Sequence, residues 1–379
     1  MTALSTSLYG PSVPYHDPTW QHGEIAADIV RPMLEVMGGG RFIGGPEVEA
    51  FEDEFAAFSG SRFFVSAASA SDALELALRG AGLQAGQSVI VAANSFVANL
   101  ASVVRAGGVP ELVDCDSNGL LDPDLLPDRL TGATGAVVPV HSHGQMCRMD
   151  EIEAAVQGRS VTIVENAGLA HGATRHGRVP GAWSRASVTC FYHDRVLAAY
   201  GDGGGIMTDD PHVAARVRLL ANHGMGETAE PIELGMNSQL DAMHAVVLRA
   251  KLHRVAGWIS MRRSMAEHYN ELLRPLADAG LISLPQVLDG NESVWSRYVI
   301  QVADGRDRVF TAMSEHGVET AIHYRTPLHL TQACRDLGYG PGDFPVAERL
   351  AREVLSLPIY PGMSEQAQER AVDVLAAAL

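Results

Sequence analysis

Cysteines are few in this sequence, and long apolar runs are absent from it. The four cysteines form no CxxC pair, so neither a disulfide framework nor a cysteine-based zinc site is indicated. No apolar stretch approaches the roughly 20 residues that a membrane-spanning helix needs. Residues 1–18 also lack the basic segment and apolar core of a secretory signal peptide. We therefore expect a cytoplasmic protein that does not enter a membrane.

Positive charge is also scarce. Lysine and arginine together number 28 against 45 aspartates and glutamates, which gives a formal net charge of −17. A surface of that sign repels nucleic acid and anionic lipid, so neither is an expected partner.

Short apolar runs rich in β-branched residues alternate with helical segments between residues 62 and 210. This alternation predicts an α/β fold with a mostly parallel sheet and helices on both faces. In such a sheet, ligands bind at the carboxyl ends of the strands. The predicted strands cover residues 63–65, 89–91, 111–113, 136–140 and 161–164.

The second part of the chain has a different pattern. After residue 210 it is mostly helical, with one long helical segment from 239 to 262 and on to 273. From about residue 280 it is mixed, and it ends in helices over 346–354 and 365–379. A chain of this length suits one large core and a smaller one. We predict a large domain over residues 1–250, with an irregular arm at its start, and a small α/β domain over 251–379.

The most informative stretch is residues 189–205, which predict a strand, a polar turn and a glycine-rich loop. Phe191, three intervening residues, Arg195 and then Gly201-Asp202-Gly203-Gly204 resemble the lysine loop of the DegT/DnrJ/EryC1/StrS sugar aminotransferases. That family uses pyridoxal phosphate (PLP). The resemblance extends over nearly the whole chain, through Gly45-Pro46-Glu47-Val48-Glu49, Val138-Pro139-Val140-His141 and Leu355-Ser356-Leu357-Pro358 among other stretches.

The resemblance implies a fold type I PLP-enzyme architecture, with a large domain built on a mostly parallel seven-stranded-type sheet and a smaller C-terminal domain. It also implies a homodimer with active sites at the subunit interface. Several residues match positions of the family's PLP pocket. Ala70 and Ser71 match the turn that holds the phosphate at a helix start, and Phe96 matches the residue that stacks on the ring. Asn237 matches an asparagine that reaches in from the partner subunit.

The reactive positions of that pocket differ here. Arg195 stands at the position of the Schiff-base lysine, and a guanidinium is always protonated and is a poor carbonyl nucleophile. Asn166 stands where the family has the aspartate that keeps the pyridine nitrogen protonated, and an amide cannot supply that counter-charge. Leu169 replaces a glutamine near the ring, and Cys190 replaces a serine. We therefore expect no cofactor, with PLP or pyridoxamine phosphate (PMP) as the alternative.

The resemblance implies that several loops carrying histidines come together at the pocket. The turn His193-Asp194-Arg195 places a base, a carboxylate and a fixed cation together, and His143 is a further candidate catalytic residue. The alternative for this turn is a surface loop with an Asp194–Arg195 pair. His141 and His143 lie at a spacing compatible with a metal, but no third ligand is evident, so we expect no metal. The residues expected to contact substrate are His141, His171, His323, Tyr324 and His329.

These observations favour an enzyme that has lost PLP Schiff-base chemistry. It would use the pocket for PLP-independent acid–base or carbonyl chemistry, meaning cyclisation, isomerisation, dehydration or condensation. Its substrate would be a small polar or anionic molecule in natural-product or specialised sugar biosynthesis. One alternative is a PLP- or PMP-dependent sugar aminotransferase or dehydratase that acts without an internal aldimine. The other is a non-catalytic partner of an active homologue.

Overall fold

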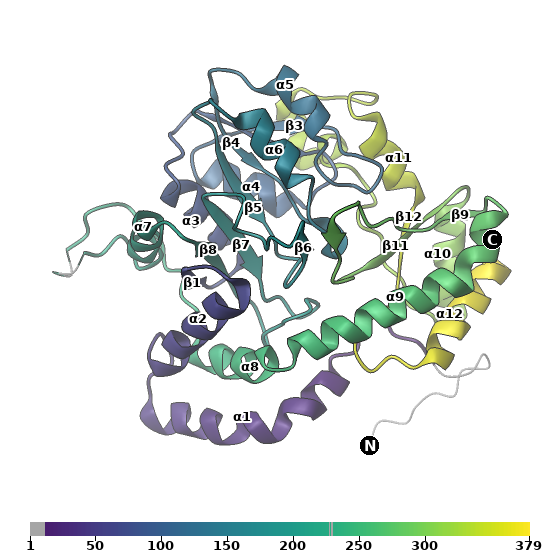
Figure 1. The fold of residues 1–379 in the computed structure, drawn as a ribbon, viewed down its shortest axis with the longest axis horizontal. Helices are drawn as coiled ribbons and strands as arrows, with labels where there is room; N and C mark the ends of the chain where they lie inside the picture. Colours follow the sequence, from purple (N-terminus) through teal and green to yellow (C-terminus); the bar gives the residue numbers. More distant parts are fainter. Residues whose placement is uncertain (1–11, 227, 229) are drawn as a thin grey trace.

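A seven-stranded sheet, here called the large sheet, forms the centre of the molecule (Figure 1). The computed structural model describes residues 12–226, 228 and 230–379, so the first eleven residues of the expected N-terminal arm lie outside the described part. Strand β8 runs antiparallel to both of its neighbours, and the other pairings are parallel, which confirms the mostly parallel sheet predicted from the sequence. The strand order is β1 (Phe63–Ala67), β8 (Gly204–Thr208), β7 (Ala186–Cys190), β5 (Thr162–Asn166), β4 (Thr134–Val138), β2 (Ser88–Ala92) and β3 (Val109–Val113).

Helices cover the faces of the large sheet because its strands are apolar on both sides. Every residue of β4, β7 and β8 is buried. Since a strand without a polar face needs cover on each side, most of the crossovers between parallel strands run through helices. The helices that precede, connect or follow these strands are α1 (Thr19–Gly39), α2 (Pro46–Ser59), α3 (Ala70–Gly80), α4 (Val97–Arg105), α5 (Leu126–Arg129), α6 (Met149–Val156) and α7 (Pro211–Ala221).

A second, antiparallel sheet of three strands, the small sheet, has its own apolar core. Its order is β12 (Val354–Leu357), β11 (Tyr298–Val302) and β9 (Ile282–Ser283). Helices α10 (Arg306–Glu315) and α12 (Glu365–Ala378) pack there, and α9 (Val255–Asp278) runs along the lower side of Figure 1 toward them. The division of the chain into domains at residue 250 stays a prediction. Other elements are α8 (Ala242–Leu252), α11 (Pro345–Glu353), and the pair β6 (Thr174–Arg175) and β10 (Asn291–Glu292).

The long helix expected from residue 239 onward is two helices. A tight turn closes α8, because the Arg254 N–H bonds the carbonyl of Lys251 three residues earlier rather than four. Apolar residues continue at helical spacing across that turn, so the sequence pattern does not reveal it.

An aromatic cluster fixes the start of the loop after β7. Phe191 lies within 5.3 to 6.1 Å of the rings of Phe51, Phe55 and Phe64, all in edge-on geometry, and His171 stacks on it. All five side chains are buried. This cluster joins α2 to the large sheet and sets the direction in which residues 192–203 leave it. Within the described part of the chain, no helix is long and apolar enough to cross a bilayer.

Candidate active site

A cavity of about 470 Å³ lies at the carboxyl edge of the large sheet. The loops that follow β1, β2, β5 and β7 meet there, as expected for parallel strands, and residues next to the small sheet complete the wall. Ten of the residues predicted from the sequence line it, although their roles stay predictions. They are Ala70, Ser71, Phe96, Asn166, Leu169, Cys190, Asp194, Arg195, His323 and Tyr324.

The start of α3 forms one end of the cavity. Ser69 caps the helix by accepting a hydrogen bond from the Asp72 N–H at 3.1 Å. Gly204 of β8 lies directly against this turn, since a Cβ there would sit 2.7 Å from the Ala70 nitrogen. The first turn of a helix leaves backbone N–H groups without helical partners and carries partial positive charge. This end of the cavity is therefore suited to a phosphate group.

Two aromatic rings line one part of the cavity. Phe96 is 55% exposed, and its ring stacks at 6.1 Å on that of Tyr324. Asn166 projects from the end of β5, where its amide donates to Asn99 Oδ1 at 2.7 Å and accepts from the Gly168 N–H at 3.0 Å. Glu165 points to the other face of the strand and bonds His141, so it supplies no carboxylate here.

Arg195 forms an ion pair with Asp194, and its side chain is only 16% exposed. Its Nε is buried without a hydrogen-bond partner. Burial opposes the charge, but Cys190 and Asp194 outweigh burial and hold the pKa of Arg195 above its ordinary value. The alternative prediction for this turn is a surface loop with an Asp194–Arg195 pair. The pair is present, but both residues line the cavity.

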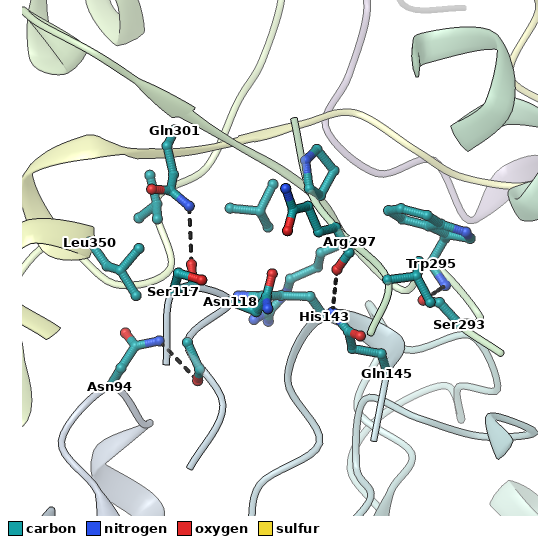
Figure 2. Close-up of a pocket in the computed structure, with 16 residues that line it drawn as sticks. Asn94, Ser117, Asn118, His143, Gln145, Ser293, Trp295, Arg297, Gln301 and Leu350 are labelled. Atoms are coloured by element: carbon teal, nitrogen blue, oxygen red, sulfur yellow. Dashed lines mark hydrogen bonds between the residues drawn. The ribbon is translucent and has the colours of Figure 1, made fainter. Parts of the chain in front are cut away.

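Arg297, which the sequence did not single out, reaches the same carboxylate from the small-sheet side. It precedes β11, lies 3.8 Å from Asp194 Oδ2, and is 8% exposed. Arg297 also lines a second cavity of about 40 Å³, shown in Figure 2, where its backbone N–H donates to the carbonyl of His143 at 3.3 Å. Burial and the charge of Arg297 lower the pKa of His143 to about 3. His143 is therefore a neutral residue outside the main cavity.

Of the predicted histidines, only His323 lines the main cavity. Its Nδ1 bonds Ser356 Oγ at 2.8 Å, and burial followed by the charge of Arg297 lowers its pKa. His193 is exposed on the loop and does not line the cavity.

The other predicted histidines are engaged away from the cavity. His141 bonds Glu165 at 2.8 Å, and His329 bonds Glu348 at 3.1 Å. His171 bonds Thr189 at 2.5 Å, and burial lowers the pKa of its ring to about 3. In the part of the chain that the structure describes, no three His, Cys, Asp or Glu side chains gather as metal ligands.

Asn237 does not line the cavity of its own chain. It is exposed and bridges to Asn222 at the base of the segment that follows α7, which projects to the left of Figure 1. Near the end of this segment Leu234 is 88% exposed.

The sequence reasoning also missed Lys251, the one lysine among all 379 residues. It is buried in α8 below the loop after β7, where its Nζ donates to the Ala198 carbonyl at 2.8 Å. Burial lowers its pKa to about 8. It does not line the cavity. A count of lysines would have shown that no other side chain can carry a Schiff base.

Comparison with known proteins adds the family. The model of the DegT/DnrJ/EryC1/StrS aminotransferase family matches residues 24–376. The erythromycin biosynthesis sensory transduction protein EryC1 of Saccharopolyspora erythraea is 39% identical over 96% of this chain and 99% of its own. The dTDP-3-amino-3,4,6-trideoxy-alpha-D-glucose transaminase of Streptomyces venezuelae is 35% identical over 98% and 97%. The structure of DesV from S. venezuelae, in complex with a ketimine intermediate, matches with a TM-score of 0.92 at 35% identity and covers 97% of this chain and 98% of its own.

The expectation that the cavity takes no cofactor is wrong. NtdA of Bacillus subtilis, solved with bound cofactor PMP, matches with a TM-score of 0.89 at 26% identity over 99% of this chain and 86% of its own. The DesV structure and the named transaminase point the same way. The expectation rested on the lost reactive groups at Arg195 and Asn166, whereas a helix start and an exposed aromatic ring still line the cavity. The chain belongs to the DegT/DnrJ/EryC1/StrS aminotransferase family.

Proposed function

We propose that this chain is a sugar-modifying enzyme that holds PMP or PLP in the main cavity without a covalent bond to the protein. One observation carries the proposal. The cavity keeps a helix start for a phosphate and an open aromatic face, while Arg195 takes the place of an amine and the sole lysine lies outside. The family and its named transaminases support a sugar substrate, and EryC1 supports a setting in natural-product biosynthesis.

The residues of the cavity fit the phosphate and the ring of this cofactor but not its covalent attachment. When bound, the cofactor supplies an amine or aldehyde and a ring that delocalises negative charge from a neighbouring carbon. The N–H groups of Ala70 and Ser71 would hold the phosphate, and Phe96 would cover one face of the ring. Asn166 would hydrogen-bond the ring nitrogen but could not supply a counter-charge.

Proton transfer falls to His323 in this proposal rather than to His193. His323 lines the cavity, and because its Nδ1 is engaged by Ser356, Nε2 is the ring nitrogen left for a ligand. Its lowered pKa keeps the ring neutral at physiological pH, and in the tautomer whose Nδ1–H donates to Ser356 Oγ, Nε2 holds the lone pair that would take a proton. His193 is exposed on the loop, away from the cavity wall.

Purified protein should bind PMP and PLP reversibly. Titration should give a saturable change in the cofactor absorbance, and gel filtration in denaturant should remove the cofactor completely. After PLP and borohydride, peptide mapping should find no stoichiometric adduct, because only Lys251 and the chain amino terminus carry a primary amine. Failure of both cofactors to bind would end the proposal, and so would a stoichiometric adduct on Lys251.

Gly204→Ala should weaken PMP binding about 10- to 100-fold, since a Cβ at this position would push into the backbone of Ser69 and Ala70 and displace the N–H groups that hold the phosphate. Affinity for pyridoxamine, which lacks the phosphate, should change much less. Gly257→Ala is the matched control, because a Cβ at that helical position meets nothing within 4 Å. An equal loss for both ligands would place the phosphate elsewhere.

A second chain is the expected partner, and we propose a homodimer. The exposed Leu234 and Ile232 and the position of Asn237, off its own cavity, favour insertion of the segment after α7 into a neighbouring subunit. The exposed segment after α7 also supports a second candidate function. In this alternative the chain is a non-catalytic partner that completes the site of a lysine-bearing homologue. Sedimentation of the protein alone and with such a homologue would separate the two.

A further inference from the structure

Three arginines and one aspartate form a cluster at the wall of the main cavity, which Asp194, Arg195 and Arg297 line and Arg262 does not. Arg195 comes from the loop after β7, Arg297 from the residue before β11, and Arg262 from α9. Arg262 is 1% exposed, and it donates to backbone carbonyls, including that of Ile359 at 2.8 Å. Asp194 pairs with Arg195 and Arg297.

The three guanidinium groups of the cluster carry more positive charge than Asp194 neutralises. Within the described part of the chain, Asp194 is the only carboxylate that forms an ion pair with any of the three guanidinium groups. Asp194 stabilises Arg297 only weakly, because the two side chains are 3.8 Å apart. The Nη1 of Arg297 is also buried with no hydrogen-bond partner. The Nε of Arg195 is likewise unpartnered. Buried guanidinium groups left this way are costly unless an anion completes their hydrogen bonds.

Asp202 is the other carboxylate on the cavity wall, but it does not complete the cluster. It is exposed, and no ion pair joins it to an arginine within the described residues. The helix start at Ser69–Asp72 is a separate anion site, already assigned to the phosphate of the cofactor. A second anionic group would therefore have to belong to another molecule.

We propose that Arg195 and Arg297 bind a carboxylate of the substrate, so that the enzyme acts on an acidic sugar. This inference rests on the proposed function, because it places the substrate beside the cofactor in the same cavity. Guanidinium groups offer parallel N–H donors that match a planar carboxylate, and two of them approach here from different sheets. Arg297 is then a specificity residue that couples the small sheet to substrate binding.

The test compares two free sugars that differ at one group. D-glucuronate has a carboxylate where D-glucose has a hydroxymethyl group, and each is titrated into the PMP-loaded protein by calorimetry. We expect clear preference for D-glucuronate in the wild type. Arg297→Gln should reduce that preference about 10- to 100-fold, as expected for a lost charge-assisted contact, and Arg297→Lys should restore part of it. Both variants should still bind PMP.

Arg31→Gln is the control for the loss of one positive charge, since Arg31 is on α1 and its side chain is 89% exposed. It should leave the preference unchanged. If the wild type shows no preference up to the solubility limit of the sugars, or if Arg297→Gln keeps the full preference, the carboxylate site is refuted. That result would leave the proposed function intact as long as PMP binds. Loss of PMP binding in the wild type would refute the proposed function instead.

Discussion

Arg195→Lys should change a reversibly bound cofactor into one that borohydride fixes to the protein. Among the described residues no amine lines the main cavity, and Lys251 is buried below the loop with its Nζ bonded to Ala198. A lysine at position 195 would place an amine beside Cys190 and near the guanidinium of Arg297, whose charge favours the neutral, nucleophilic form. The expected effect is a change from no adduct at this position to about one per chain.

The measurement is peptide mapping after PLP and borohydride, with absorbance recorded before reduction. Arg31→Lys is the matched control, because it adds one lysine at a position that is 89% exposed and remote from the cavity. It should gain only slow, substoichiometric labelling. If Arg195→Lys is labelled no faster than Arg31→Lys, the cofactor is not bound where the cavity suggests.

The same variant should not become a transaminase. Asn166 would still leave the ring nitrogen without a counter-charge, so the ring would remain a weak electron sink. Only the double variant with Asn166→Asp should convert an amino donor and PLP into the corresponding keto acid and PMP. Activity in the single variant would show that the asparagine does not limit the chemistry.

The sequence predicted the main cavity well where residues follow strands directly. Phe96, Asn166 and Cys190 come together because each sits at the carboxyl end of a strand of the large sheet, and strand ends can be read from apolar runs. The family resemblance placed them by position, and the structure agrees with that placement.

The histidines were harder to place from the sequence. His141 and His171 also follow strands, yet both side chains turn into the protein and bond buried partners, Glu165 and Thr189. Which way a loop side chain points depends on packing that no local pattern records. His323 faces the cavity from the far end of the chain for the same reason.

Arg297 illustrates a different limit. It belongs to the small sheet, and about a hundred residues separate it from Asp194, so no spacing in the sequence links the two. The sequence alone shows that the reactive groups at positions 195 and 166 have changed. It does not show the shape of the cavity. The helix start packed against Gly204 and the exposed ring of Phe96 do not depend on which side chain occupies position 195.

Lys251 should make the protein gain stability as the pH rises into the alkaline range. Its ordinary pKa of 10.5 falls to about 8 in the folded protein because the amine is buried. Below about pH 8 both states carry the proton, and the folded state bears the cost of a buried charge. Between about pH 8 and 10.5 the folded state releases the proton while the unfolded state keeps it, so the free energy of unfolding rises.

Lys251→Met removes this titration. The free energy of unfolding of the wild type minus that of the variant should increase by about 3 kcal/mol between neutral pH and pH 10.5, from a shift of 2.5 pKa units, 10.5 minus 8. Lys251→Arg, which keeps the charge throughout this range, should show the same difference from the wild type. Chemical denaturation at a series of pH values measures all three proteins, and groups common to them cancel in the subtraction.

Lys251 also contacts the loop of residues 192–203, which lines the main cavity. Lys251 donates to Ala198 and lies 5.0 Å from the ring centre of Tyr200, so it ties α8 to the loop that carries Arg195. Loss of the amine should therefore loosen residues 192–203, and in either variant PMP should protect this loop from proteolysis less than it does in the wild type. If the difference in free energy of unfolding between the wild type and the variants does not change with pH, the amine is solvated. The loop is then held by other contacts, chiefly the aromatic cluster around Phe191.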